Sequence, residues 1–265
     1  MTKPELKLVY AEDLTYFSEK CVDAFVSKRM VRHLTKDEID KMFVLDEDKV
    51  SDSTTLTNRV ADGGQFDIWS NFTLPADKTE RDGRLVFLND ANVNFHDNFI
   101  SVPSSLSVNT KNWSALYVEV GAKVVFDGTD NGGIIVNGDT RQDLDGPYCI
   151  TNFGGEITIN GGHYEGCGTC VYGYEGKTII NGGFFYATPI NTHANNIHPW
   201  TLNLLNDAYN NGTASIEVRG GTFVNFDPSN PNTDDAPSYV PAGYTVRQEV
   251  QQNGDIFYIV EKVGN

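Results

Sequence analysis

An internal repeat restricts what this chain can fold into more than any other feature of its sequence. Four segments of eight residues align without gaps, and each reads as a short strand that ends in a polar residue and a glycine. The segments span residues 121–128, 154–161, 175–182 and 213–220, so their starting positions advance by 33, 21 and 38 residues. A structural unit of about 20 residues, with longer loops inserted in two of the three steps, explains this spacing.

Side chains of a strand alternate between its two faces, so the aligned segments define rows of residues across neighbouring strands. Two rows are predicted to point inward, namely Val124, Ile157, Thr178 and Ile216, and Phe126, Ile159, Ile180 and Val218. The row between them contains a charged residue and is predicted to point outward; it is Val125, Thr158, Ile179 and Glu217. The same register predicts two rows further upstream, namely Leu116, Cys149, Cys170 and Ala208, and Tyr117, Ile150, Val171 and Tyr209.

Stacking such units in parallel would bury the inward rows as continuous ladders, which is the construction of a β-solenoid. Glycine is expected at the corners because it adopts a positive φ without a steric penalty. Asp127, Asn160 and Asn181 suit the tight bend that precedes it. A β-sandwich or jelly roll also contains many short strands, but it would not keep four rows in register from residue 116 to residue 220. The predicted fold class is all-β, a parallel β-helix with a small N-terminal α-helical segment.

Residues 1–50 differ in composition from the remainder of the chain. They contain no glycine and carry a net charge of −2, from 9 basic and 11 acidic residues, whereas all 25 glycines lie in residues 51–265. Apolar residues at helical spacing predict a helix from Glu12 to about Val31, and a capping box at Thr35 and Glu38 predicts a second. Two short helices cannot bury much surface alone. We expect them either to cap an open end of the main domain or to attach it to a partner. The candidate anchor residues are Leu14, Phe17, Phe25, Ile39 and Phe43.

The net charge of −16 and the pI near 4.6 argue against two classes of partner. Phosphate contacts need a basic surface, so binding to nucleic acid is not expected. Docking on or insertion into an anionic membrane is not expected either. Met1–Glu5 has neither the apolar core nor the cleavage site of a signal peptide, and no apolar run approaches the ~20 residues of a membrane helix. We therefore expect synthesis and assembly in a cytoplasm.

The cysteines form a C-x-x-C motif at Cys167 and Cys170. A zinc site would need two more ligands, for which Cys149 and His163 are the candidates. The rows instead predict buried thiols that fill the core as small apolar groups. A disulfide between Cys149 and Cys170 would be possible on adjacent rungs but is not required. We predict no metal, no cofactor and no catalytic residue.

Two loops carry the other residues to which chemistry could be assigned. The acidic segment Asp139–Asp145 could supply paired carboxylates or bind a cation, but we expect a solvated loop. The excursion Thr188–Thr201 contains the candidate ligand-binding residues His193, His198 and Trp200. Their rings could stack on a sugar or pack on a neighbouring subunit. Trp69 and Trp113 are expected in the core or in an interface.

Several strings resemble the rungs of right-handed, pectate-lyase-like β-helix proteins. They are Ile-Thr-Ile-Asn-Gly-Gly-His-Tyr at 157–164 and Thr-Ile-Ile-Asn-Gly-Gly-Phe-Phe at 178–185, and the stretch 56–77 is similar to the first turn of such helices. In the closing part, Leu202–Ala208 leads into Ile216–Pro228, and Tyr239–Val246 precedes a final strand at Ile256–Val260. This combination resembles β-helix proteins encoded by bacteriophages of gut bacteria, which occur as virion fibres or capsid appendages. The resemblance covers roughly residues 55–263.

The resemblance implies a homotrimeric, non-enzymatic structural protein of the virion: a head fibre, a capsid decoration or a tail fibre. Residues 1–50 would contact other virion proteins of the capsid or tail, residues 51–238 would form the β-helix, and residues 239–265 would supply capping strands. Host-surface glycans are a candidate ligand. One alternative is a tailspike-like polysaccharide depolymerase or lyase, which would need a carboxylate cluster in one groove. Another is a bacterial surface adhesin, which would need an export signal.

Overall fold

A computed structural model describes residues 47–74, 85–102, 114–136, 148–188, 191–193, 196–197, 200–231 and 238–264. The chain divides into two compact units, residues 1–44 and residues 45–265. All described residues belong to the second unit. The two predicted N-terminal helices and the anchor residues Leu14, Phe17, Phe25, Ile39 and Phe43 lie outside the described residues, so their role stays a prediction.

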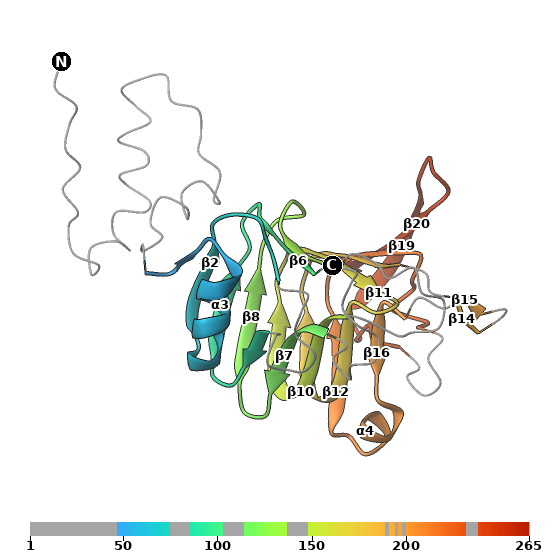
Figure 1. Cartoon of the computed structure of the whole chain (residues 1–265). Coiled ribbons are helices and arrows are strands. Elements are labelled where there is room, and N and C mark those ends of the chain that lie inside the picture. The colour runs from blue at the N-terminus through green and yellow to red at the C-terminus, as the bar shows by residue number, and fades with distance from the viewer. Residues whose placement is uncertain are drawn as a thin grey trace, which may run out of the picture. The chain divides into compact units, whose positions relative to one another are not determined.

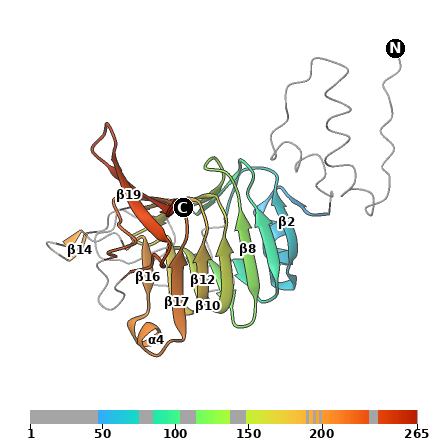
Figure 2. The same cartoon turned by 180° about the vertical axis from the view of Figure 1, so that it is seen from behind.

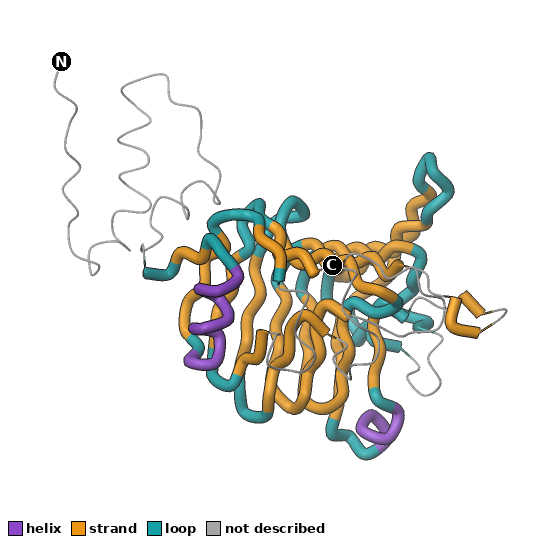
Figure 3. The backbone as a smooth tube through the Cα atoms, viewed as in Figure 1, coloured by secondary structure: helices purple, strands orange, loops and turns teal. Residues whose placement is uncertain are grey.

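The second unit consists mostly of β-strands, and its larger parallel sheet is strongly curled (Figures 1 and 3). Sheet A contains β1 (Lys49–Val50), β2 (Gly64–Ile68), β4 (Leu85–Phe87), β5 (Ala91–Asn94), β7 (Ser114–Glu119), β8 (Lys123–Asp127), β10 (Tyr148–Ile159), β12 (Val171–Ile180), β16 (Leu202–Leu204) and β17 (Ala214–Val218). Sheet B contains β3 (Phe72–Thr73), β6 (Phe99–Val102), β9 (Gly133–Val136), β11 (His163–Cys167), β13 (Phe184–Thr188), β18 (Gly221–Val224), β19 (Tyr244–Val250) and β20 (Ile256–Lys262). A small third sheet pairs β14 (Asn191–His193) with β15 (Asn196–Ile197).

The two inward rows predicted from the repeat are confirmed. Strands β8, β10, β12 and β17 lie side by side in sheet A (Figure 2) and pair in parallel in the predicted register. All eight side chains of the two rows are buried, and the largest exposed fraction among them is 7%, at Ile216. The rows continue upstream, where Val93 of β5 and Phe66 of β2 extend the row of Phe126. The intervening row is partly exposed, as expected for side chains that point outward. Parallel pairing throughout sheet A shows that the sandwich alternative was wrong.

The rows predicted further upstream are only partly correct. Ile150 pairs with Val171 as predicted. Leu116, however, pairs with Ile150 and not with the preceding Cys149. Paired residues are 34 positions apart along β7 but 33 apart along β8, so the connection between β7 and β8 carries one residue more than the matching part of β10, which has a bulge at Phe153 and Gly154. The fourth members of these rows, at positions 208 and 209, lie in the short helix α4 (Asn206–Asn210), and Leu202 takes the strand position opposite Val171. The local strand period could not reveal the bulge or the inserted helix.

The paired glycines that end three of the four repeat segments have two different roles. In the Asn-Gly-Gly of residues 160–162, the second glycine, Gly162, has a φ of +102°, which favours glycine. The first glycine, Gly161, is needed for a different reason: a Cβ there would lie 2.3 Å from the carbonyl oxygen of Gly128 on the neighbouring turn. Residues 181–183 follow the same pattern. The positive φ predicted for the glycine that follows Asn160 and Asn181 is therefore wrong for that glycine, which close backbone approach explains, and the positive φ occurs one residue later.

Sheet B presents a column of aromatic rings to the interior. Tyr164, Phe185 and Phe223 occupy paired positions on β11, β13 and β18. Their rings stack with interplanar angles of 11° and 8° and centroid distances of 5.1 and 4.8 Å. All three side chains are fully buried. The core between the two sheets therefore combines branched aliphatic rows on one side with a stacked aromatic column on the other.

A helix covers the first strands of this unit, where the sequence suggested only the first turn of the repeat. The helix α3 (Ser53–Arg59) is capped by Asp52, whose carboxylate accepts a hydrogen bond of 2.8 Å from the backbone N–H of Thr55. Its one buried residue, Leu56, joins the core, and the helix contacts β1 and β4. The parallel pairing of β1 with β2 shows that the sheet already begins at Lys49.

At the other end, the predicted final strand is confirmed. Strand β20 pairs antiparallel with β18, and β19 then pairs antiparallel with β20 (Figure 1). The hairpin thus covers β18, the last parallel strand of sheet B. The residues of the hairpin do not alternate regularly between buried and exposed. Most of β19 is exposed.

A polar side chain inside the core explains why the inward row tolerates Thr178. The amide nitrogen of Asn152 donates to the Thr178 hydroxyl at 3.2 Å and to the carbonyls of Gly155 and Lys177 at 3.1 Å. Its oxygen accepts from the backbone N–H groups of Gly154 and Gly155. Asn152 thereby satisfies the backbone at the bend in β10, where a buried unpaired group would cost stability.

Candidate functional site

The loop residues chosen from the sequence are placed only in part. His193 is the last residue of β14, which pairs antiparallel with β15, and Trp200 is half-buried. His198, Trp113 and the acidic segment Asp139–Asp145 lie outside the described residues. The hypothesis that His193, His198 and Trp200 contact a glycan or a neighbouring subunit therefore stays a prediction.

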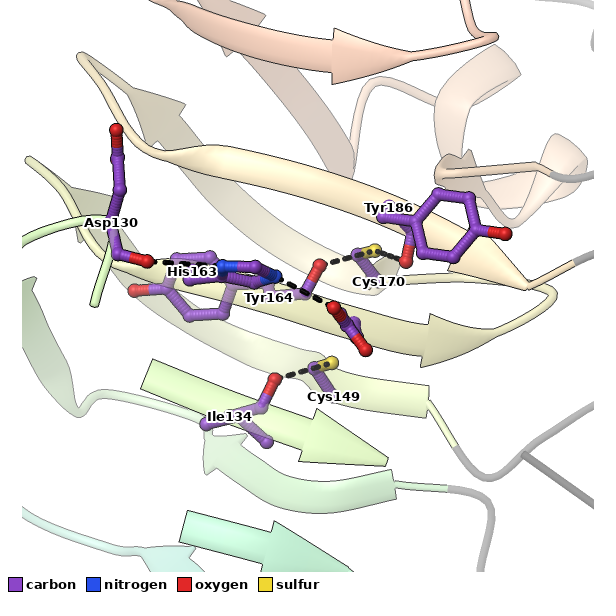
Figure 4. A network of polar contacts seen from close by, with 8 residues as sticks. Asp130, Ile134, Cys149, His163, Tyr164, Cys170 and Tyr186 are labelled. Atoms are coloured by element: carbon purple, nitrogen blue, oxygen red, sulfur yellow. Dashed lines mark hydrogen bonds and ion pairs between the residues drawn. The ribbon is translucent and has the colours of Figure 1, made fainter. Parts of the chain in front are cut away.

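The three cysteines among the described residues lie in the core, as the rows predicted for Cys149 and Cys170. Cys149, Cys167 and Cys170 are fully buried, and Cys149 and Cys170 carry free thiols. The Cys170 thiol donates to the carbonyls of Tyr164 and Tyr186 at 3.3 Å (Figure 4). Burial, and then interaction with Cys170, raises the pKa of the Cys149 thiol well above its usual value. The Cys149 thiol is therefore protonated at neutral pH, and the buried thiols act as small core groups.

A row of aromatic rings crosses the strands on the outer face of sheet B. We call Phe99 on β6, His163 on β11, Phe184 on β13 and Phe257 on β20 the outer aromatic row. Consecutive ring centroids are 5.6, 4.8 and 5.6 Å apart. Each of the four residues is partly exposed. The row is therefore a continuous series of aromatic rings that crosses the strands of sheet B from β6 to β20.

Small residues at two positions allow the rings of this row to meet. Gly133 of β9 lies between Phe99 and His163 in the strand register. A Cβ at Gly133 would lie 1.9 Å from the carbonyl oxygen of His163, so no larger residue fits there. Thr222 of β18 lies opposite Phe184 and carries no ring. Phe257 of β20 pairs with Val224, two residues further along β18, so the last step of the row is diagonal.

A hydrogen-bonded charged pair lies at the centre of the row. The Nε2 atom of His163 is 2.9 Å from the Glu165 carboxylate, and its Nδ1 atom is 3.1 Å from the backbone carbonyl of Asp130 (Figure 4). The two side chains keep 19% and 33% of their surface exposed. His163 and Glu165 belong to adjacent outward positions of β11, because Tyr164 between them points into the core.

The surroundings of His163 act on its pKa in opposite directions. Desolvation is the largest single effect and lowers the pKa. Two hydrogen bonds, to Glu165 and to Asp130, raise the pKa, as do the negative charges of both carboxylates. Together they outweigh desolvation, so the pKa of His163 is raised overall. The imidazole therefore carries a proton over a wider pH range than a free histidine.

Tyr186 adds a further polar group beside the outer aromatic row. It pairs with Glu165 in the register of β13 and β11 and is partly exposed. Burial, and then the negative charges of Asp255 and Glu165, raises the pKa of Tyr186. Its hydroxyl consequently remains a hydrogen-bond donor at neutral and mildly alkaline pH. The outer face of sheet B thus places donors and acceptors directly beside aromatic rings.

The sequence contained a signal for this row that the search for catalytic motifs overlooked. The residue after each Gly-Gly pair is His163, Phe184 and Thr222 in turn, and it is the first or second residue of a strand of sheet B. Because the following aromatic residue is buried, the residue itself must point outward. His163 entered the sequence argument only as a possible zinc ligand. It lies on the outer face, away from the buried cysteines, and no group of metal-ligating side chains is found among the described residues.

A second polar pair lies near the start of sheet A but is enclosed. His96 and Asp67 are both buried and are 2.7 Å apart. The ring of Trp69 meets His96 edge-on at 6.1 Å, and the Lys49 ammonium lies 4.6 Å from the centroid of Trp69. Trp69 is 38% exposed, so it belongs to the surface and not to the core. The contact between Asp67 and His96 links β2 to the turn after β5, so this cluster has a structural role.

Comparisons with known proteins leave the function to be inferred from the fold and its surfaces. Searches against protein-family models, curated proteins and solved structures gave no match. Within the described residues, no helix is long and apolar enough to cross a membrane.

Proposed function

We propose that this chain is a non-enzymatic structural protein of a bacteriophage virion, built as a right-handed parallel β-helix. The observation that carries the proposal is the alternation of the two sheets along the chain. Successive turns contribute β2 then β3, β5 then β6, β8 then β9, β10 then β11, β12 then β13, and β17 then β18. Neighbours in sheet A are also neighbours in the same order in sheet B. Right-handed winding follows from the strong preference of parallel crossover connections for that hand.

This architecture suits a particle appendage. A stack of turns with an uninterrupted core resists unfolding from its flanks, and only its two ends need protection. Helix α3 covers the first end, and the β19–β20 hairpin covers the last strand of sheet B. Three such stacks side by side would form a homotrimeric head fibre, capsid decoration or tail fibre. The N-terminal region would attach it to other virion proteins, and its flanks would contact host-surface glycans.

Association with particles tests the proposal directly. Full-length protein and a variant lacking residues 1–44 are supplied to particles assembled without the native chain, and the particles are purified on a density gradient. The deletion ends before β1, which pairs with β2 and belongs to the sheet. We expect the full-length chain to sediment with particles and the variant to remain unbound while keeping its β-sheet circular dichroism. A full-length chain that never co-sediments would contradict the virion assignment.

Sedimentation equilibrium of the purified full-length chain tests the trimer separately. A trimer is expected to persist on dilution because its subunits would contact along their whole flanks. A monomer at all concentrations would contradict the trimer but would not bear on the β-helix fold.

A polysaccharide depolymerase or lyase is the second candidate. The observation that favours it is the exposed His163–Glu165 pair, because a histidine and a carboxylate are the usual groups for general acid–base chemistry. Incubation with bacterial capsular polysaccharides, followed by measurement of reducing ends and of unsaturated sugars, decides between the two. Turnover that is lost in Glu165→Gln would establish the enzyme.

A further inference from the structure

We infer that the outer aromatic row binds an extended chain of neutral or amine-bearing pyranose sugars along the axis of the strand stack. The inference rests on the proposed glycan contact of the particle protein. It assigns that contact to residues of sheet B that are distinct from the loop residues His193, His198 and Trp200. The inference names the ligand class and the residues, and each can be tested on the purified chain.

The length and direction of the row favour an extended ligand. The row runs from β6 through β9, β11, β13 and β18 to β20, which are consecutive neighbours in sheet B. The centroid distances of 5.6, 4.8 and 5.6 Å allow a separation of up to about 16 Å between the first and the last ring. A ligand that contacts all four rings must therefore be a chain of several units and not a compact molecule.

The chemistry of the row matches the two surfaces of a pyranose ring. The C–H groups on one face of the sugar carry a slight positive charge and pack on the electron-rich face of an aromatic ring. The hydroxyl groups around the sugar need donors and acceptors within the same plane. Glu165 supplies acceptors, Tyr186 supplies a donor, and His163 lies hydrogen-bonded between Glu165 and Asp130. Apolar walls with a few polar groups are typical of sites that orient a small ligand.

The charge of the surroundings selects against acidic sugars. Asp130 and Glu165 flank His163, and the charges of Asp255 and Glu165 act on Tyr186. The whole chain carries a net charge of −16. Uronic or sialic acids would be repelled by these carboxylates, whereas neutral sugars would not, and amino sugars would be attracted.

A second copy of the chain fits this face less well. Stable protein interfaces bury about 800 Å² on each partner, and charged residues are depleted at their centre. The outer aromatic row is one residue wide, its rings are already half-buried, and a charged pair lies in its middle. Burying His163 and Glu165 under a protein surface would remove water from both without supplying further partners.

Isothermal titration calorimetry of the full-length chain at constant pH tests the inference. The probes are cellohexaose, chitohexaose, maltohexaose and mannohexaose, with hexagalacturonate as the acidic counterpart. We expect at least one neutral hexasaccharide to bind and hexagalacturonate not to bind. Phe184→Ala should weaken the binding by at least about tenfold, because it interrupts the row at its centre. Tyr186→Phe, which keeps the ring and removes one hydroxyl, should weaken binding by about threefold to tenfold.

Tyr174→Ala is the matched control. Tyr174 lies on β12 in sheet A, is 40% exposed and contacts other aromatic rings, but it does not belong to the row. Its replacement should leave the affinity unchanged. The thermal melting curve of each variant is recorded, and Tyr186→Phe decides the matter if Phe184→Ala does not fold.

Four results would overturn the inference: binding of none of the neutral probes, equal binding of hexagalacturonate, loss of affinity in Tyr174→Ala but not in Tyr186→Phe, or dissociation of an oligomer by the row variants. The last would assign the row to contacts between subunits. None of these results bears on whether the chain sediments with particles, so the virion proposal and the sugar site can fail independently.

Discussion

Sheets A and B are stacked in the same way but present different side chains to the core. The inward rows of sheet A consist mainly of branched aliphatic residues, such as Ile157, Ile159 and Ile180, whereas sheet B contributes the stacked rings of Tyr164, Phe185 and Phe223. Both kinds of row are fully buried and in strict register. A curled parallel sheet therefore constrains the position of each inward side chain more than its chemical type.

The outer faces of the two sheets also differ. Between its inward rows, sheet A presents the mixed outward row of Val125, Thr158, Ile179 and Glu217, and it carries contacting aromatic rings at Phe153, Tyr172 and Tyr174 as well. Sheet B presents the outer aromatic row, with a glycine placed where two rings must meet and with the hydrogen-bonded His163–Glu165 pair beside its rings. This polar pair beside the rings is the reason for assigning ligand contact to sheet B.

The largest difference in stability between an inward and an outward substitution is expected in sheet A. Ile159→Asp places an unpaired carboxylate in a fully buried position and should cost more than about 4 kcal/mol, enough to abolish cooperative unfolding in most domains. Thr158→Asp, one residue earlier on the outward face, should change stability by less than about 0.5 kcal/mol. Thermal melting followed by circular dichroism measures both. Similar melting curves for the two variants would contradict the assignment of the rows.

The same comparison can be made on sheet B with aromatic residues. Phe185→Ala removes a ring from the middle of the buried column and should destabilise the protein by about 3–5 kcal/mol. Phe184→Ala, on the same strand but in the outer aromatic row, should cost about 1 kcal/mol because the ring is already partly in water. Chemical denaturation of both variants gives the two free energies. Equal losses would mean that the outer row is a second core.

The sequence was sufficient to predict the strands that repeat without interruption. Two inward rows and the register of β8, β10, β12 and β17 follow from apolar alternation and from the terminal glycine alone. The repeat alignment did not include the earlier strands β2 and β5, although the resemblance placed a first turn at 56–77, because Gly64 and Ala91 occupy positions where later strands have Val124 or Ile157. A repeat cannot be recognised by hydrophobicity when its members are this small.

Other features depend on contacts that no local pattern encodes. The one-residue shift at Phe153 and Gly154 depends on Asn152, whose side chain binds the backbone of two strands. The outer aromatic row joins residues that are 158 positions apart, from Phe99 to Phe257. His193, His198 and Trp200 are close together in the chain, and for that reason the sequence predicted the ligand site in their loop.

Replacing glycines that are required for different reasons should change the free energy of unfolding by smaller amounts. Gly182→Ala would bring a Cβ within 2.5 Å of the carbonyl oxygen of Asn160, so the two turns must separate, at a cost of about 1–3 kcal/mol. Gly212→Ala has open space but a φ of +71°, so only local backbone strain of about 1 kcal/mol is expected. Urea denaturation distinguishes them. A larger loss at Gly212 would mean that dihedral strain, and not close approach of the turns, determines where glycine is required.

The smallest effect is a pH dependence that sheet B should show through the outer aromatic row. The raised pKa of His163 means that the folded protein holds this proton more tightly than the unfolded chain does. The resulting stabilisation is fully present below about pH 6.5, the ordinary value for histidine, and is lost as the pH rises through the higher pKa of the folded state. His163→Gln should therefore flatten the fall in melting temperature across this range relative to the unmodified chain. Glu165→Gln should flatten it as well, because it removes the hydrogen bond and the charge that raise the pKa. If both variants keep the original slope, the proton on His163 is not coupled to folding, and the pair at the centre of the row serves only the ligand.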